Sequence, residues 1–519
     1  MLGLETLPVL LRDAAERFGE HPAYVDGAST TSYADLLTRV EVVAASYVAR
    51  GLEPGRAVAI WAPNSTDWAV AALAVTYAGG VLVPLNSRYT AHEVADVLAR
   101  TDAALALVAD GFLGRHQIAE LTGLGTTAQV VDLASIAEVE GSEDDLAEAR
   151  RRADAVRADD VADVLFTSGT TGRSKGAMSA HRQTIGVARA WAGLGGVRQD
   201  DRYLVVNPFF HSFGYKIGIV VGLLTGASLY PVATFDLDAT MRLIQDERIT
   251  LLPGAPTIYQ SLLTAPQRVD FDLSSLRLAV TGAAVVPVVL IERMRAASPH
   301  GLGIDQVVTA FGMTEAVVVT MCREGDSAET VATTNGRAIP GMETRIDEET
   351  GELLVRGAYV TLGYLDDPEA TAAAIDADGW LHTGDVGALD ETGNLRITDR
   401  LKDMYISGGF NVYPAEVEQV LMRLDGVDDV AVVGVPDERL GEVGKAYVVG
   451  AASPEEVVAF AKERLANFKV PRHVAHLDAL PRNLSGKVLK TALRGSQART
   501  SGTTLRGSQA RASGTTEED

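Results

Sequence analysis

Short apolar runs bounded by turn residues alternate with helix-like amphipathic stretches along much of the chain. Most of the runs have no polar face of their own, as expected for strands that are buried on both sides of a sheet. They are AVAIWAP (57–63), VLVPL (81–85), ALALVAD (104–110), VADVLFT (161–167), YLVVNPFF (203–210), LRLAVTG (276–282) and QVVTAFG (306–312). The alternation predicts an α/β fold with largely parallel sheets in a large N-terminal domain.

One helix is marked clearly by its start, its stripe and its end. Ser32 followed by Asp35 predicts a capping box, and Gly51 predicts the helix end. Between them the apolar residues recur at helical spacing, at Leu36, Leu37, Val40, Val43, Ala44 and Tyr47. We expect this stripe to face the core.

The uncharged stretch from Trp68 to Ser87 has about the length of a membrane span. Gly79, Gly80 and Pro84 interrupt it. The stretch therefore predicts a buried helix followed by the strand VLVPL, without integral membrane association.

The pattern changes toward the C-terminal end. Shorter strands with tight turns, from about Glu343 to Arg400, predict a β-rich subdomain. The helices that follow, predicted at 414–424 and 454–465, flank the strands DVAVVGV and KAYVVGA in a small α+β unit, with Ser453 as the cap of the second helix. With a boundary within TDRLKDM (398–404), we expect a large domain over 1–399 and a small mobile domain over 400–494.

A near-perfect duplication ends the chain: LRGSQARTSGTT (493–504) recurs as LRGSQARASGTT (505–516). Two copies without an apolar face cannot build a core, so residues 495–519 are predicted to be disordered.

The net charge and the cysteine content limit the binding partners and the cellular compartment that we expect. The formal net charge of -23 predicts a surface that repels nucleic acid and anionic membranes, so an anionic substrate requires a locally basic pocket. The single cysteine, Cys322, excludes an internal disulfide and fits a reducing, cytoplasmic compartment. The residues after Met1 lack the basic segment and apolar run of a secretion signal.

The run TSGTTGRSKG (167–176) directly follows the predicted strand VADVLF. Glycines let backbone N–H groups approach phosphate oxygens, and Lys175 adds a point charge. A flexible linker is the alternative, but linkers seldom follow a buried strand directly. The P-loop pattern fails because Lys175 is preceded by Ser174 and followed by Gly176.

Six further stretches occur in an order typical of one family: NPFFHSFG, TGAAVVP, FGMTE, GWLHTGD, DRLKDMYISGGFNVYPAEVE and PRNLSGK. Together with TSGTTGRSKG they resemble the motifs of the adenylate-forming superfamily, which contains acyl-CoA synthetases, luciferases and adenylation domains. The resemblance implies that a carboxylate is joined to the α-phosphorus of ATP with release of pyrophosphate. In the CoA ligases of the family, coenzyme A then takes the acyl group.

The resemblance implies roles for individual residues of the large domain. The outgoing phosphates would be held by Thr170, Thr171 and Lys175, within a loop that also contains Thr167, Ser168, Gly169 and Gly172. Glu315 would bind Mg2+, and Thr314 would contact the α-phosphate. Phe311 would stack on adenine where a tyrosine is frequent, and Gly282 and Ala283 would line the nucleotide site. Asp385 would accept hydrogen bonds from the ribose hydroxyls, with Arg400 as a ribose or phosphate partner.

Other implied roles belong to the small domain and to the acid pocket. Lys487 would stabilise the transition state of acid adenylation, and Lys402, where an aspartate is frequent, would be the hinge. After rotation of the small domain, Gly408 and Gly409 would line the tunnel for the pantetheine arm of CoA. His211 would gate the acid substrate rather than act as a base, because a carboxylate is already ionised at neutral pH.

The substrate is less closely defined. DDRYLVVNPFFHSFGYKIGI, the segment from DRLKDM to EVEQVL, and VATTNGR resemble actinobacterial ligases that activate the methylhydrindanedione propanoate left from sterol rings C and D. Tyr215 and Lys216 fit either an acid pocket or core packing. The alternatives are a fatty or aryl acid:CoA ligase, a stand-alone acyl-AMP ligase that loads a carrier protein, and a nucleotide sensor without turnover. The oligomeric state stays open, and a homodimer is compatible with the sequence.

Overall fold

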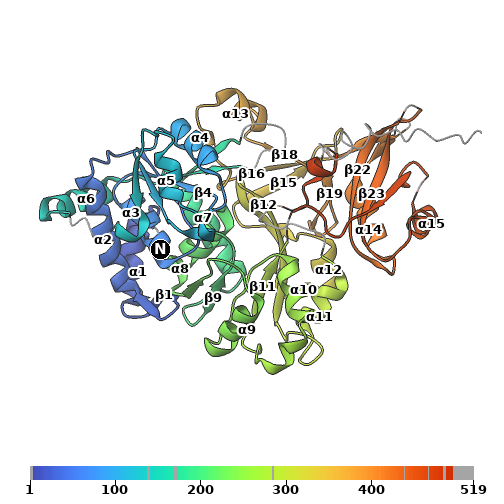
Figure 1. The fold of residues 1–519 in the computed structure, drawn as a ribbon, viewed down its shortest axis with the longest axis horizontal. Helices are drawn as coiled ribbons and strands as arrows, with labels where there is room; N and C mark the ends of the chain where they lie inside the picture. Colours follow the sequence, from blue (N-terminus) through green and yellow to red (C-terminus); the bar gives the residue numbers. More distant parts are fainter. Residues whose placement is uncertain are drawn as a thin grey trace, which may run out of the picture. The chain divides into compact units, whose positions relative to one another are not determined.

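The chain divides into two compact units, Met1–Thr398 and Asp399–Asp519 (Figure 1). The computed structural model describes residues 4–136, 141–167, 174–282, 286–400, 403–407, 410–437, 439–465, 467–482 and 487–494. The duplicated tail, 495–519, lies outside the described residues.

A seven-stranded sheet with the order β17-β8-β7-β4-β3-β5-β6 forms one part of the first unit. Five neighbouring strands run parallel: β3 (Ala57–Trp61), β4 (Val81–Leu85), β5 (Leu105–Val108), β6 (Gln129–Asp132) and β7 (Val161–Phe166). The apolar runs predict these strands except the edge strand β6. At one edge β8 (Gly176–Ala180) and β17 (Gly363–Tyr364) pair antiparallel. The predicted α/β class is confirmed, with an antiparallel addition at this edge.

Two four-stranded sheets continue the first unit. One has the order β2-β1-β10-β9 and contains β1 (Pro22–Asp26), β2 (Ser29–Ser32), β9 (Arg202–Val205) and β10 (Ser228–Pro231). The other has the order β11-β12-β13-β14 and contains β11 (Leu278–Thr281), β12 (Gln306–Met313), β13 (Ala316–Met321) and β14 (Arg337–Ala338). Leu251 forms parallel bridges to both Tyr203 and Leu278, so it joins the two sheets.

A third four-stranded sheet, of order β15-β16-β18-β19, is the predicted β-rich part of the large unit. It contains β15 (Met342–Ile346), β16 (Glu352–Gly357), β18 (Leu381–Leu389) and β19 (Leu395–Arg400). The pairs β15–β16 and β16–β18 are antiparallel, as short strands with tight turns predict.

The helices of the first unit cover these sheets (Figure 1). They are α1 (Leu7–Phe18), α2 (Tyr33–Ala49), α3 (Thr66–Tyr77), α4 (Ala91–Thr101), α5 (Gln117–Thr122), α6 (Glu143–Ala155), α7 (His181–Leu194), α8 (Val221–Thr225), α9 (Leu237–Asp246), α10 (Pro256–Thr264), α11 (Val288–Arg295), α12 (Ala328–Thr333) and α13 (Pro368–Ala374). Short 3₁₀ turns are η1 (Phe112–Gly114), η2 (Leu133–Ser135) and η4 (Pro266–Asp270), and η3 (Phe213–Val220) is a π-helix.

Local sequence signals explain several helix bounds. The Asp35 N–H donates to Ser32 Oγ at 3.0 Å, so Ser32 is confirmed as the cap of α2, while the reciprocal bond of the predicted capping box is not among the described contacts of this helix start. The described stripe is confirmed as well, with Leu37 half-buried and its other members buried. Helix α3 is buried along nearly its whole length, as the uncharged stretch predicts. No helix among the described residues is both long and apolar enough to cross a membrane.

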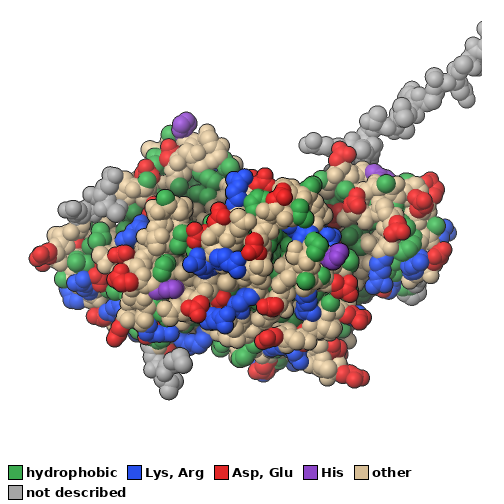
Figure 2. Space-filling model, turned by 90° about the horizontal axis from the view of Figure 1, so that it is seen from below, with side chains coloured by type: hydrophobic (Ala, Val, Ile, Leu, Met, Phe, Trp, Pro, Cys, Tyr) green, Lys and Arg blue, Asp and Glu red, His purple; other side chains and the backbone are tan. Residues whose placement is uncertain are grey.

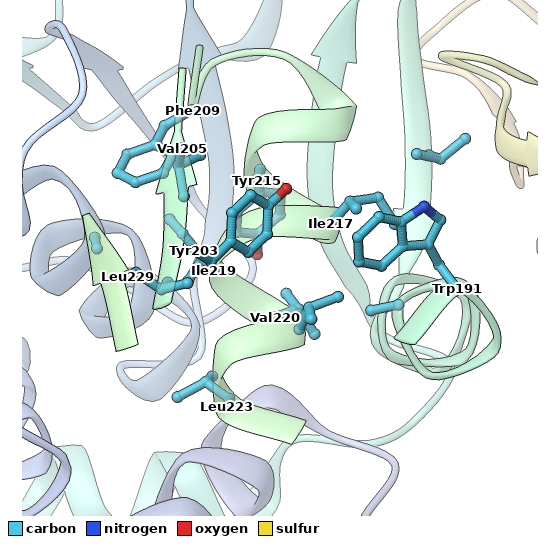
Figure 3. Close-up of a cluster of buried hydrophobic side chains, with 14 of the residues drawn as sticks. Trp191, Tyr203, Val205, Phe209, Tyr215, Ile217, Ile219, Val220, Leu223 and Leu229 are labelled. Atoms are coloured by element: carbon cyan, nitrogen blue, oxygen red, sulfur yellow. The ribbon is translucent and has the colours of Figure 1, made fainter. Parts of the chain in front are cut away.

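The π-helix η3 runs through a tightly packed part of the core (Figure 3). Tyr215, Ile217 and Val220 project from it toward Trp191 of α7 and the side chains of β9 (Figure 3). Gly214 is required at its start, because a Cβ there would lie 2.0 Å from the Pro208 carbonyl oxygen.

The second unit is a small α+β fold. Its sheet contains β20 (Tyr405–Ser407), β21 (Phe410–Val412), β22 (Val427–Asp437), β23 (Gly441–Gly450) and β24 (His473–His476), flanked by α14 (Pro414–Leu421) and α15 (Pro454–Arg464). Ser453 and Glu456 form the capping box of α15, as its sequence indicates. Helix α14 ends at Leu421 rather than at the predicted Leu424.

Candidate functional site

The glycine-rich loop closes a β-hairpin between β7 and β8. The Thr167 N–H donates to the Lys175 carbonyl oxygen at 2.9 Å, and the Lys175 N–H donates to Thr167 Oγ1 at 3.4 Å. Ser168, Gly169, Thr170, Thr171 and Gly172 lie outside the described residues. The sequence places this loop after a buried strand, but it does not reveal that the chain returns antiparallel.

The FGMTE motif lies at a second hairpin, between β12 and β13. A bulge at Gly312 shifts the register, and a Cβ at this position would lie 2.0 Å from the Val317 carbonyl oxygen. Phe311 packs half-buried against the core, and Thr314 is half-buried in the turn. The side chain of Glu315 is only 8% exposed.

Tyr364 of β17 connects the two hairpins. Its hydroxyl donates to Glu315 Oε1 at 2.7 Å. Lys175 Nζ lies 4.7 Å from the centroid of the Tyr364 ring, which is a cation–π contact. Two residues predicted to act on the nucleotide, Lys175 and Glu315, thus contact one tyrosine, Lys175 at the ring face and Glu315 at the hydroxyl.

Burial, and then the neighbouring Glu315 carboxylate, raise the pKa of Tyr364 well above its usual range. The hydroxyl therefore keeps its proton at neutral pH and remains a donor. Sequence reasoning missed this residue, because a tyrosine after glycine in a loop-like stretch carries no chemical signal by itself.

The fit of Glu315 to Mg2+ depends on what else is near it. Carboxylate oxygen is a ligand that Mg2+ prefers, usually with phosphates and water completing the shell. Among the described residues no group of three or more His, Cys, Asp or Glu could hold a metal ion. The described donors therefore fit an ion that arrives with nucleotide phosphates and is held by one carboxylate, rather than a closed all-protein site.

A polar cavity of about 340 Å³ lies beside Lys175, lined by Arg100, Ser174, Lys175, Leu365, Asp366 and Asp367. Arg100 comes from α4, and its Nη1 donates to Ser174 Oγ at 3.4 Å. Its guanidinium carbon lies 4.8 Å from the Phe166 ring centroid. Arg100 adds a second cation that the sequence did not single out, since its helix lies far from the loop in sequence.

Gly282 directly follows β11, which pairs in parallel with β12. A Cβ on Gly282 would lie 2.9 Å from the Ala310 carbonyl oxygen, so only glycine fits here without movement. Gly282 and Phe311 are therefore carried by neighbouring strands. Ala283 lies outside the described residues.

His211 lies at the start of the segment that leads into η3. The Phe213 N–H donates to His211 Nδ1 at 3.2 Å. Desolvation lowers the pKa of His211. Its predicted gating role stays a prediction.

Tyr215 and Lys216 are core residues in this structure, which decides between the two readings that the sequence left open. Tyr215 is 0% exposed and Lys216 is 1% exposed. Lys216 Nζ lies 3.0 Å from Asp163 Oδ1 and donates to Ser179 Oγ at 2.7 Å. Thr184 Oγ1 donates to Asp163 Oδ2 at 2.8 Å. The sequence missed this pairing because its members lie on β7, β8, α7 and η3.

Asp385 lies in β18 and is 3% exposed. Its N–H donates to Thr383 Oγ1 at 3.1 Å, and this hydroxyl donates to the Leu353 carbonyl oxygen at 2.7 Å. The preceding Gly384 N–H donates to Glu352 Oε1 at 2.8 Å. This network fixes the backbone that carries Asp385.

The second unit carries the remaining predicted residues. Lys487 is half-buried and lies next to Val488, which bridges antiparallel to Arg482. The backbone of Arg400 ends β19. Lys402, Gly408 and Gly409 lie outside the described residues.

Charges on the surface are mixed rather than uniformly acidic. Figure 2 shows acidic and basic side chains interspersed over one face. At the cavity beside Lys175, the cations Arg100 and Lys175 are accompanied by the carboxylates of Asp366 and Asp367, so its described lining is mixed in charge rather than basic.

Comparison with protein-family models identifies the family of this chain. The model of the AMP-binding enzyme family matches residues 11–365, and that of its C-terminal domain matches residues 416–487. The chain belongs to the AMP-binding enzyme family. The resemblance to adenylate-forming enzymes is therefore confirmed.

Curated relatives of this family are similar over nearly the whole chain. One from Rhodococcus jostii is 56% identical, over 94% of this chain and 98% of its own length. One from Mycobacterium tuberculosis is 54% identical, over 95% of this chain and 99% of its own length. Both are named 3-(7a-methyl-1,5-dioxo-octahydro-1H-inden-4-yl)propanoyl:CoA ligase.

A solved family structure has a similar fold. ATP-bound MatB from Rhodopseudomonas palustris superimposes with a TM-score of 0.83 at 31% identity, over 95% of this chain and 99% of its own.

Proposed function

We propose that this chain is an AMP-forming carboxylic acid:CoA ligase. It converts a carboxylic acid, ATP and coenzyme A into acyl-CoA, AMP and pyrophosphate by way of an acyl-AMP intermediate. The observation that carries the proposal is the 56% identity, over 94% of the chain, to a relative named as a propanoyl:CoA ligase. The pairing of Lys175 and Glu315 around Tyr364 supports it, because both charges suit a metal-bound polyphosphate.

The proposed acid is a propanoate attached to a methyl-substituted bicyclic dione, of the kind left when sterol rings are degraded. The shared name of two relatives at 54% and 56% identity supports this choice over fatty and aryl acids. A place in steroid catabolism follows from the substrate. We propose a cytoplasmic location, where ATP and CoA are supplied.

The individual roles remain proposals. Lys175 with Thr170 and Thr171 holds the leaving phosphates, and Glu315 binds the Mg2+ that arrives with ATP. When bound, the ion draws negative charge from the phosphate oxygens. Adenine and ribose contacts fall to Phe311, Thr314, Gly282, Ala283, Asp385 and Arg400.

The second unit is proposed to move between the two half-reactions. Lys487 stabilises the negative charge that develops during adenylation, and Lys402 is the hinge for domain rotation. Gly408 and Gly409 line the pantetheine tunnel in the thioester step. His211 gates the acid pocket.

Release of pyrophosphate tests the proposal. Purified protein is given ATP, Mg2+ and a panel of fatty, aryl and hydrindane-type propanoic acids, with and without CoA. We expect pyrophosphate release that depends on the acid, is highest with the bicyclic propanoate, and yields acyl-CoA when CoA is present. Release that no acid stimulates would refute the ligase, and turnover only with an added carrier protein would favour a stand-alone acyl-AMP ligase.

A further inference from the structure

The segment 361–365 is held by backbone bonds to both hairpins of the candidate site. The Thr361 N–H donates to the Glu315 carbonyl oxygen at 2.8 Å. The Leu365 N–H donates to the Gly176 carbonyl oxygen, also at 2.8 Å. Tyr364 is therefore fixed by its neighbours against the residues that precede β13 and follow Lys175.

The side chain of Tyr364 is fixed as well. The backbone N–H of Tyr364 donates to Thr371 Oγ1 at 2.9 Å, and its side-chain hydroxyl donates to Glu315 Oε1 at 2.7 Å. The ring carries Lys175 Nζ at 4.7 Å from its centroid. One side chain thus contacts a carboxylate through its edge and an ammonium through its face.

Lys175 and Glu315 form no ion pair with any residue that the structure describes. A lysine side chain is long and flexible, so a partner for its ammonium restricts where that charge lies. The tyrosine offers each charge a weaker neutral partner instead. Both charges consequently remain available to an outside cation and an outside anion.

We propose that Tyr364 is a positioning residue that holds the Glu315 carboxylate and the Lys175 ammonium apart and oriented for a metal-bound nucleotide. The inference rests on the proposed function. The hydroxyl fixes the carboxylate by binding Oε1, which leaves Oε2 to a metal ion. The ring face restricts the position of the ammonium.

Three variants separate these two effects. Tyr364→Phe removes the hydroxyl bond to Glu315 but keeps the ring beside Lys175. Tyr364→Leu removes both contacts. Tyr359→Phe is the matched control, since it removes a hydroxyl from a half-buried tyrosine that precedes this segment and has its ring beside Gly186 and Gly341.

The measurement is calorimetric binding of α,β-methylene ATP with and without Mg2+, together with thermal unfolding of each variant. In Tyr364→Phe we expect the gain in affinity from Mg2+ to fall about tenfold, with unchanged metal-free affinity, because the partners that orient a metal ligand are worth about that much. In Tyr364→Leu the metal-free affinity should also fall about two- to fivefold, as expected for a lost cation–π contact. Tyr359→Phe should behave like the wild type.

A wild-type gain from Mg2+ in Tyr364→Phe would overturn the proposal. So would an equal loss of metal-free affinity in Tyr364→Phe and Tyr364→Leu. The Glu315→Gln background provides a second measurement: there Tyr364→Phe should leave the gain from Mg2+ unchanged, and a further loss would count against the role.

This binding test is independent of turnover. If the wild type binds the analogue with a gain from Mg2+ but no acid stimulates pyrophosphate release, the proposed function fails while the role of Tyr364 stands. If pyrophosphate release is normal and Tyr364→Phe keeps its gain from Mg2+, only the role of Tyr364 fails.

Discussion

His181 is a buried histidine whose neutral form is built into the fold. The Leu7 N–H donates to His181 Nδ1 at 3.2 Å, which fastens the start of α1 to the junction of β8 and α7. Burial lowers the pKa of His181 from 6.5 to about 4, opposed by the nearby Asp160 carboxylate. A proton on Nδ1 would remove the acceptor of this bond.

The lowered pKa predicts a loss of stability in mild acid. His181 binds a proton near pH 6.5 in the unfolded chain and only near pH 4 in the folded chain. Its contribution to the unfolding free energy is therefore complete above pH 6.5 and is lost as the pH falls toward 4. Between pH 7 and pH 5 we expect the unfolding free energy to fall by about 2 kcal/mol more in the wild type than in His181→Gln. Urea unfolding at both values measures the difference, and equal losses would show that His181 is not responsible.

At the scale of elements, the Lys216–Asp163 pair ties η3 to the hairpin of the glycine-rich loop. Asp163 lies on β7, and the second partner of Lys216, Ser179, lies on β8. Burial lowers the pKa of Lys216, while the Asp163 carboxylate opposes this shift. Breaking such a pair leaves one buried charge uncompensated.

We therefore expect Lys216→Met to destabilise the first unit by about 3–5 kcal/mol, because Asp163 would be left buried without its cation. The double variant Asp163→Leu, Lys216→Met should be markedly more stable than Lys216→Met alone, since no charge is then buried. Tryptophan fluorescence in urea reports this unit, which contains all 4 tryptophans. A single variant as stable as the wild type would contradict the pairing.

The sequence predicts the elements well where local patterning decides them. Ser32 and Ser453 mark true helix starts, and the run VLVPL is β4 from its first residue to its last. Prediction from the sequence fails where contacts between distant residues determine the structure. Examples are β8, which pairs antiparallel with β7, and Lys216, whose partner lies on another element. Arg100 and Tyr364 are missed for the same reason, because only the fold brings them to Lys175.

At the scale of the whole molecule, two units share the proposed chemistry. The family models match both, over residues 11–365 and 416–487, and Lys487 is the last residue of the second match. Glu315 and Lys175 belong to the first unit and Lys487 to the second. In the proposed mechanism Lys487 serves acid adenylation, and a different arrangement of the two units serves thioester formation.

The two half-reactions of Lys487→Ala test this claim most directly, with Lys490→Ala as the control in the same segment. Lys490 pairs with Glu418 at 2.9 Å and has no proposed role in the reaction. Acid-dependent pyrophosphate exchange measures adenylation, and CoA transfer from supplied acyl-AMP measures the second step. We expect Lys487→Ala to lose adenylation by about 100-fold or more while CoA transfer is largely kept, and Lys490→Ala to retain both. Equal loss of both steps in Lys487→Ala, or undiminished adenylation, would contradict the account.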